Sequence, residues 1–202
     1  MKKLLTTILT LLLVAASLTA QISFGPRVGF NLTSMHESVG EHISLSGDFK
    51  PGFQIGIVAD IAVLGKRLSV QPGLLFAQQG ARFQMPIQDN IRLNYLQVPI
   101  NLQLGFETGD NHRFLLQAGP YLGFALGGTR TRNARTVVVG SRDDEVRLFD
   151  FGVGFGIGVH VYRVQVGISY NLGIANISNV SRTTTTNNGF AFTVTFLLGN
   201  GR

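Results

Sequence analysis

The sequence predicts an all-β fold, an eight-stranded antiparallel barrel in which each strand neighbours the next along the chain. Three observations predict it: apolar side chains alternate with other residues over eight segments, short and long connections follow one another between these segments, and glycine is frequent, at 25 of 202 residues. Charged residues make up only 14% of the chain, against about 25% in ordinary soluble domains. This composition disfavours a disordered tail, a coiled coil and an ordinary cytosolic enzyme.

The first 20 residues differ from the rest of the chain. Lys2 and Lys3 precede an apolar run over residues 4–18, which ends in small or polar residues near Ala20. This run is shorter than the about 20 residues that a membrane-spanning helix needs. We therefore expect a signal peptide over residues 1–20 and one barrel domain over residues 21–202, with a retained anchor helix as the alternative. The chain has no cysteine, which excludes a lipid-modified cysteine at the cleavage site and any disulfide.

The clearest strand is predicted over residues 96–106. Its apolar face consists of Leu96, Val98, Ile100, Leu102, Leu104 and Phe106. The segments 164–172 and 190–198 alternate in the same way, and in the segment 149–161 the second face is almost bare backbone because Gly152, Gly154, Gly156 and Gly158 occupy it. Glycine on an inward face allows a bulky side chain such as Tyr121 to approach the wall closely.

Four further strands are predicted over residues 22–32, 52–63, 68–83 and 114–126, which brings the total to eight. Three of the connections are short, at residues 64–67, 108–111 and 162–163. The other four are long and polar, and they cover approximately residues 33–51, 84–91, 127–145 and 173–188. Outer-membrane barrels show this arrangement, with short turns in the periplasm and longer loops outside the cell.

The amount of apolar surface indicates which face meets lipid. Eight strands with about five apolar residues each supply about forty large side chains, more than the narrow interior of an eight-stranded barrel holds. If the apolar face looks outward into lipid, the remaining Gly, Ala, Ser, Asn and Gln can fill a polar interior. Closure of the ring also satisfies backbone groups that an open edge would leave unpaired in hydrocarbon. The sequence therefore predicts a transmembrane up-and-down β-barrel of the small OmpA and OmpX type.

Five segments carry a resemblance to a known family. They read LSVQPGLLFAQQGA at 68–81, YLQVPINL at 95–102, AGPYLG at 118–123, DFGVG at 150–154 and YNLGIANI at 170–177. In this order and spacing the chain resembles the PorT-like outer-membrane β-barrel family over essentially its whole mature length. The resemblance implies an exported eight-stranded barrel in the outer membrane of a Gram-negative bacterium. It also implies a possible link to protein secretion, because the family's namesake is tied to a secretion apparatus.

Five ionisable residues are expected to point into the lumen by alternation from their apolar neighbours: Arg27, Asp60, Asp150, His160 and Arg163. Charges inside a narrow barrel need partners, because desolvated charge is costly. We therefore interpret these residues as a structural polar network that fills the lumen. A proton or ion relay through the same residues is the alternative.

No catalytic residue, cofactor or metal is expected. The patch that could suit hydrolysis lies in the first long connection and comprises Ser34, His36, Glu37, Ser38, Glu41 and His42. Some eight-stranded outer-membrane barrels modify lipids with His and Ser near the membrane surface, so an enzyme that uses His36 is one alternative. Nearness in sequence alone does not create the required nucleophile and base geometry.

The third long connection concentrates arginine, at Arg130, Arg132, Arg135 and Arg142, beside Asp143, Asp144 and Glu145. Contact with lipopolysaccharide phosphates and a solvated mixed-charge loop explain this pattern equally well. We expect a monomeric, non-enzymatic barrel that acts through its loops. Its expected partners are outer-membrane lipids, lipopolysaccharide, and secretion or envelope proteins. A narrow channel is a further alternative. Nucleic acid is not an expected partner, because the chain has no basic aromatic patch.

Overall fold

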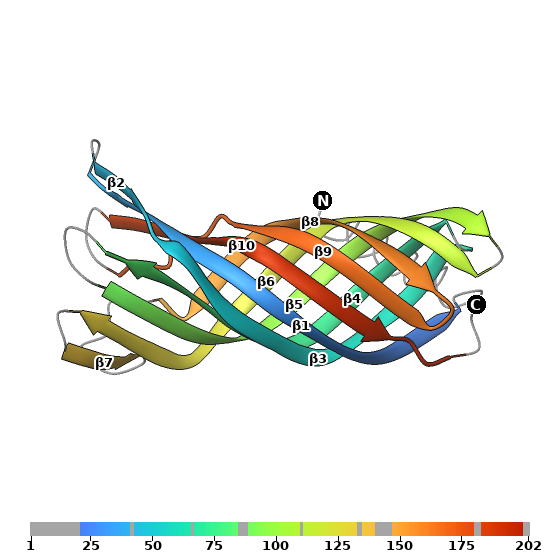
Figure 1. The fold of residues 1–202 in the computed structure, drawn as a ribbon, viewed down its shortest axis with the longest axis horizontal. Coiled ribbons are helices and arrows are strands. Elements are labelled where there is room, and N and C mark those ends of the chain that lie inside the picture. Colours follow the sequence, from blue (N-terminus) through green and yellow to red (C-terminus); the bar gives the residue numbers. More distant parts are fainter. Residues whose placement is uncertain are drawn as a thin grey trace, which may run out of the picture.

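In a computed structural model, the chain forms one antiparallel sheet that closes on itself (Figure 1). The structure describes residues 21–40, 43–65, 67–84, 89–109, 111–132, 135–139, 147–179 and 183–199. The predicted signal peptide over residues 1–20 lies outside these residues. The strands are β1 (Ile22–Val39), β2 (Ile43–Ser46), β3 (Asp48–Leu64), β4 (Leu68–Phe83), β5 (Asp89–Gly109), β6 (His112–Arg132), β7 (Arg135–Val139), β8 (Phe149–Val161), β9 (Val164–Gly173) and β10 (Thr183–Phe196). No helix in the described ranges is long and apolar enough to cross a membrane.

Eight of these strands form the ring. Each strand pairs with its neighbour in the chain, and β10 pairs with β1 to complete the circle, so the predicted eight-stranded up-and-down barrel is confirmed. The short strands β2 and β7 pair with β1 and β6 and extend one end of the barrel, as Figure 1 shows. We call this end the loop end. The opposite end, where connections of only two or three residues follow Leu64, Gly109 and Val161, is the turn end.

The registers around the ring determine the inclination of the strands. From Val28, successive partners on β3, β4 and β5 lead to Phe124 on β6. In the other direction, partners on β10, β9 and β8 lead to Phe114 on the same strand, ten residues away. Ten residues span about 33 Å along a strand, against about 38 Å for eight strand spacings. The strands are therefore inclined by about 40° to the barrel axis, as in other closed barrels.

The two faces of the wall differ as the alternation predicts. On β5, Leu102 is 47% exposed, whereas the adjacent Gln103 is 1% exposed. Partner residues form a continuous apolar belt on the outer face, made of Val28, Ile55, Phe76, Leu96, Phe124, Phe114, Val159, Val166 and Val194. The prediction that the apolar side of each strand faces away from the lumen is confirmed.

The apolar band has a defined height and an aromatic border. On β5 it extends from Leu96 to Phe106, ten residue steps that correspond to about 33 Å along the strand and about 25 Å along the barrel axis. Aromatic pairs lie where the band ends toward the loop end, with ring centroids 5.7, 5.6, 5.0 and 6.2 Å apart; they are Phe53–Phe76, Phe124–Phe149, Tyr170–Phe190 and Phe49–Phe190. An apolar band about 25 Å tall with an aromatic border is the outer surface of a membrane barrel.

Beyond this border the two faces exchange character. The outward residues of β5 change from Leu96 to Asn94 and Arg92, while the buried inward side chains include Tyr95 and Leu93. The outward face of β10 changes in the same way, from phenylalanine at 190 to asparagine at 188. A strand needs this exchange where its outer face leaves an apolar medium and meets water, because its inner face must then supply the apolar core.

This exchange corrects the predicted long connections. The structure has strand at residues 33–39, 43–46, 48–51, 89–91, 127–132, 135–139 and 183–188, all of which lie in predicted loops. That prediction is wrong because it takes the end of an outward apolar stripe for the end of a strand. The strands instead continue beyond the apolar band with a polar outer face.

Candidate functional site in the lumen and at the loop end

Arg27 is the centre of a polar network in the half of the lumen nearer the turn end. Its guanidinium donates to Thr195 Oγ1 at 2.8 Å and to Gln71 Oε1. Gln71 in turn donates to Gln165 at 2.9 Å and accepts a hydrogen bond from Gln103 at 3.0 Å. These five residues come from five different strands, so the network ties together walls that are distant in sequence.

Asp60 lies in the same part of the lumen and is 1% exposed. Its negative charge acts on the buried Arg27 guanidinium. A buried cation without a nearby anion is strongly unfavourable, so the carboxylate on β3 offsets part of the cost of burying Arg27 on β1.

Asp150 belongs to a separate cluster, nearer the loop end. Its Oδ2 accepts a hydrogen bond from the Asn187 side-chain amide at 3.0 Å, and the same amide lies 3.2 Å from the Tyr95 hydroxyl. All three side chains are at most 3% exposed. The cluster joins β5, β8 and β10 where the apolar band gives way to the polar outer face.

His160 forms a third cluster at the turn end. Its Nε2 donates to the Tyr162 backbone oxygen at 2.8 Å, which leaves Nδ1 to accept from Arg113. Arg113 was not among the predicted lumen residues, although its position immediately before the outward Phe114 identifies it as inward. Arg163 is a correction: the structure places it exposed in the turn between β8 and β9, where alternation no longer holds. The expected single network is thus three clusters.

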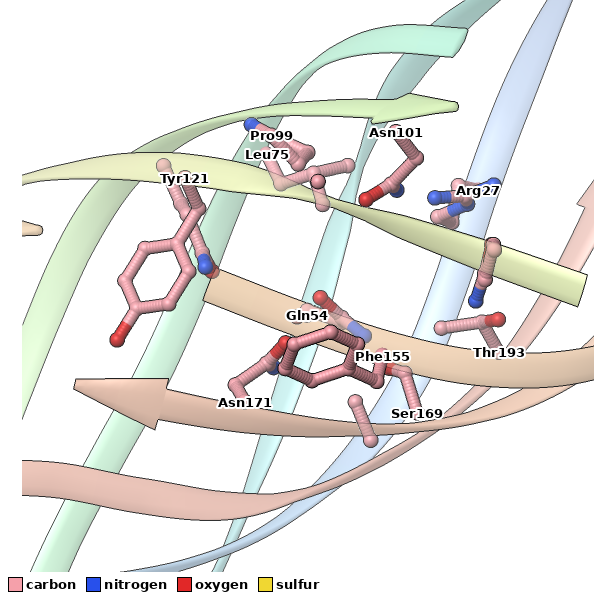
Figure 2. A pocket seen from close by; sticks show the side chains of 15 residues that line it. Arg27, Gln54, Leu75, Pro99, Asn101, Tyr121, Phe155, Ser169, Asn171 and Thr193 are labelled. Atoms are coloured by element: carbon pink, nitrogen blue, oxygen red, sulfur yellow. The ribbon is translucent and has the colours of Figure 1, made fainter. Parts of the chain in front are cut away.

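Small cavities, two of which are lined by Tyr121, lie between the side chains of the lumen. The larger leaves about 40 Å³ for the centres of water molecules, which is room for roughly three of them, and the smaller leaves about 10 Å³, enough for one. Figure 2 shows the larger cavity, with Arg27, Gln54, Tyr121 and Asn171 among the side chains around it. Tyr121 and Asn171 also line the smaller cavity. They therefore lie between the two spaces and narrow the path from one to the other.

The Tyr121 side chain fits inside the lumen because it packs against a glycine of the barrel wall. A Cβ atom added to Gly152 would be 2.6 Å from the Tyr121 hydroxyl and 2.3 Å from the Leu172 backbone oxygen, both too close for real contacts. The predicted role of glycine in letting Tyr121 approach the wall is confirmed at this position. The large aromatic side chain consequently occupies the middle of the lumen.

An apolar cluster fills the interior at the loop end. It consists of the buried residues Met35, Ala81, Phe83, Ile91, Leu93, Tyr95 and Ile177. Water is excluded from such a cluster, and an ion that crossed it would lose its hydration without gaining polar partners. The interior therefore changes from polar within the apolar band to apolar beyond it.

His36, the candidate for hydrolysis, lies on strand β1 and not in a loop. Its ring is exposed on the outer face, with Nδ1 3.0 Å from Ser46 Oγ and Nε2 2.8 Å from Ser44 Oγ. Within the described ranges, the hydrogen bonds of His36 go to these two serines and none goes to a carboxylate. Ser34 instead donates to the Gly47 backbone oxygen. The predicted Glu41 and His42 lie outside the described residues.

The arginine cluster of the third long connection is only partly described. Arg130 on β6 forms an ion pair with Asp89 on β5, with both Nε and Nη2 within 2.9 Å of Oδ2. Arg132 and Arg135 are backbone partners in the register of β6 and β7. Arg142, Asp143, Asp144 and Glu145 lie outside the described residues. Because Arg130 is engaged by Asp89, its charge is already balanced within the protein.

The side chains that could ligate metal are dispersed. In the part of the chain that the structure describes, no three of His, Cys, Asp and Glu gather closely enough to hold a metal ion. The lumen clusters each contain one carboxylate or one imidazole, surrounded by amides, hydroxyls and guanidinium groups. Such clusters hold a wall in position by hydrogen bonding.

Comparison with known proteins supplies a family. Residues 16–179 match the family described as "Outer membrane protein beta-barrel domain". This span covers most of the chain, including nine of the ten strands in whole. No curated protein matches the chain.

The chain is similar to several solved structures, including the following three. Ail, the attachment invasion locus protein of Yersinia pestis, is 9% identical, with 88% of this chain and 99% of Ail covered and a TM-score of 0.43. Neisserial surface protein A is 12% identical, with 88% and 98% covered and a TM-score of 0.47. The N-terminal β-barrel domain of Pseudomonas aeruginosa OprF is 13% identical, with 83% and 96% covered and a TM-score of 0.31.

Proposed function

The chain belongs to the outer membrane protein beta-barrel domain family, and from this membership we propose that it is a closed, non-enzymatic barrel that acts through its loop end. It is an outer-membrane β-barrel protein. In such barrels short turns face the periplasm and longer segments face the outside of the cell. We therefore place the turn end in the periplasm and the loop end outside the cell, after export directed by a signal peptide over residues 1–20.

The filled lumen is the observation that carries this proposal. Arg27, Tyr121 and the Asp150 cluster occupy the interior, and the two cavities that Tyr121 lines have room for only a few water molecules. An apolar cluster lies beyond them at the loop end. A narrow channel would need a continuous polar path, so this arrangement favours a structural or interaction role.

The loop end offers the surface for such a role. The strand pairs β1–β2 and β6–β7 extend there beyond the apolar band. Among the described strands the closed ring leaves no unpaired edge within the band, which supports a monomer in the membrane. We propose that the extended strands contact an envelope or secretion protein, in keeping with the resemblance to the PorT-like family, and that outer-leaflet lipids surround the band.

Site-specific crosslinking tests this proposal. A photoreactive residue replaces His36 at the exposed loop end, and a matched variant carries it at Arg67, which is exposed at the turn end. In native envelopes we expect the His36 position to yield one discrete protein adduct that the Arg67 position does not yield. Equal or absent adducts at both positions would contradict an interaction role at the loop end.

The enzyme alternative has its own test, because His36 contacts Ser44 and Ser46. We expect mass spectra of envelope lipids from cells with the His36→Ala barrel to equal those from cells with the unchanged barrel. A lipid species that disappears with His36→Ala and returns with the unchanged chain would support the lipid-modifying alternative instead.

A further inference from the structure

A bulge in β3 shapes the outer surface just beyond the apolar band. The register between β3 and β4 shifts between Phe49 and Gln54, where Pro51 has no backbone N–H to donate. Thr33 of β1 fills the gap: its hydroxyl donates to the Gly80 oxygen at 2.9 Å and accepts from the Gly80 nitrogen at 2.8 Å. Side-chain bonds thus replace the missing ladder, and the bulge is a fixed part of the wall.

The bulge directs Lys50 across the neighbouring strand. Its side chain lies over Gly80, where an added Cβ would be 3.1 Å from the Lys50 Cδ. The ammonium donates to the Ile91 backbone oxygen at 3.0 Å and to Asn90 Oδ1. Lys50 is only 8% exposed, so its charge is held at a fixed point between β4 and β5.

Two exposed arginines flank this fixed charge. Arg92 is the cross-strand partner of Gly80, and Arg82 is the partner of Asn90, so both lie on the same outward face. The positive charges of both act on the Lys50 ammonium. Asp48 is opposite Arg82 in the register, but it accepts a hydrogen bond from Gln84. Among the described residues no carboxylate forms an ion pair with Lys50, Arg82 or Arg92, so the cluster keeps an excess of positive charge.

This cationic cluster adjoins the apolar band. Below it on the outer face, the Gln78 amide donates to Asn94 at 3.2 Å, and below that pair lie Phe76 and Leu96 at the aromatic border. Arg92 is four residues beyond Leu96, which is about 13 Å along the strand and about 10 Å along the axis. The cluster therefore lies just outside the hydrocarbon, where lipid headgroups lie.

We propose that Lys50, Arg82 and Arg92 bind the phosphate-bearing headgroup of a lipid in the outer leaflet, while the acyl chains of that lipid lie on the apolar face below. Guanidinium groups bind phosphate through paired hydrogen bonds, and the fixed ammonium adds charge without losing side-chain freedom on binding. The site deepens the proposed lipid contact and rests on the proposed orientation, with the loop end outside. It differs from the predicted Arg130 cluster, because Arg130 is neutralised by Asp89.

Native mass spectrometry of the purified barrel tests the site. The site variant is Lys50→Gln/Arg82→Gln/Arg92→Gln, and the matched control is Arg67→Gln/Arg147→Gln/Arg163→Gln, which removes three exposed cations elsewhere. Phosphorylated lipopolysaccharide and the same lipid after phosphatase treatment serve as probes. We expect the site variant to retain about tenfold less phosphorylated lipid than the control does, and the dephosphorylated lipid to bind both proteins weakly and equally.

Three results would overturn the site. The first is equal retention of phosphorylated lipid by the site variant and the control, and the second is equal retention of the two lipids by the unchanged barrel. The third is displacement of the lipid by millimolar inorganic phosphate, which would indicate a site for free phosphate. Heat-dependent gel mobility verifies that each variant is folded, and the single exposed variants Arg82→Gln and Arg92→Gln replace the triple variant if it does not fold. Reagent labelling of the loop end on intact cells tests the orientation separately, so failure of the proposed function is distinguishable from failure of the site.

Discussion

Replacing Arg27 with methionine removes the cation at the centre of the polar network near the turn end while keeping a long side chain in its place. The substitution deletes hydrogen bonds to Thr195 and Gln71 and takes away the positive charge that acts on Asp60. Removal of one member of a buried charged group costs about 3–5 kcal/mol, because its partners stay desolvated. We therefore expect Arg27→Met to lower the free energy of unfolding by about that amount.

Equilibrium unfolding in urea, with the barrel in lipid vesicles and followed by circular dichroism, measures this change. Arg67→Met, at an exposed turn position, is the control and is expected to change stability by less than about 0.5 kcal/mol. The double variant Arg27→Met/Asp60→Leu is expected to recover part of the loss, since it removes the buried anion as well. A loss below about 1 kcal/mol for Arg27→Met, or a double variant as unstable as the sum of the two single changes, would refute the reasoning.

Three further outcomes follow from the geometry. Gly152→Ala is expected to lower the free energy of unfolding by about 1–3 kcal/mol, because the added Cβ would overlap Tyr121. In the control Gly167→Ala the added Cβ would be 3.3 Å or more from its neighbours, so the expected loss in the same unfolding assay is less than about 1 kcal/mol. Tyr162 has a φ of 55°, so Tyr162→Asn is expected to be better tolerated than Tyr162→Val, as judged by the two melting temperatures; equal values would contradict backbone strain there. In planar bilayers the unchanged barrel is expected to show no discrete conductance steps, and regular steps would favour the channel alternative.

The ring strands were predictable because lipid imposes one uniform requirement on the outer face. Every second residue from Leu96 to Phe106 is apolar, and the structure keeps that face outward throughout. The confirmed contact between Gly152 and Tyr121 has a different origin, since a narrow lumen requires small residues opposite large ones. Periodicity, together with the alternation of short and long connections, was therefore sufficient for the number of ring strands and the direction of their apolar faces.

The loop end was not predictable from the same pattern. Beyond Leu96, toward the loop end, the outward residues of β5 become polar while the strand continues. A prediction that relies on outward apolar residues therefore ends the strand too early, at the aromatic border. The prediction that Arg163 points into the lumen is wrong for a local reason. Arg163 lies in a turn next to Tyr162, whose positive φ interrupts the alternation. Arg113 could have been found by extending the alternation one residue before Phe114.

Identifying the hydrogen-bond partners of the lumen residues requires the three-dimensional structure. Alternation places Arg27 and Asp150 on the same face, but only the registers show that Arg27 contacts Gln71 whereas Asp150 contacts Asn187. The Lys50 cluster depends on a bulge, for which the sequence offers only the Pro51–Gly52 pair as a signal. Such features follow from how strands are paired and not from any one strand's pattern.

Spin labelling of single-cysteine variants tests the central claim most directly, and the natural absence of cysteine makes it practicable. Labels at Ile100 and Leu102 report on the outer face of β5, and labels at Asn101 and Gln103 report on the lumen side. In lipid vesicles we predict that the labels at Ile100 and Leu102 collide readily with oxygen and rarely with a water-soluble nickel complex. Greater access of the nickel complex to Ile100 and Leu102 than to Asn101 and Gln103 would contradict an outer face that contacts lipid.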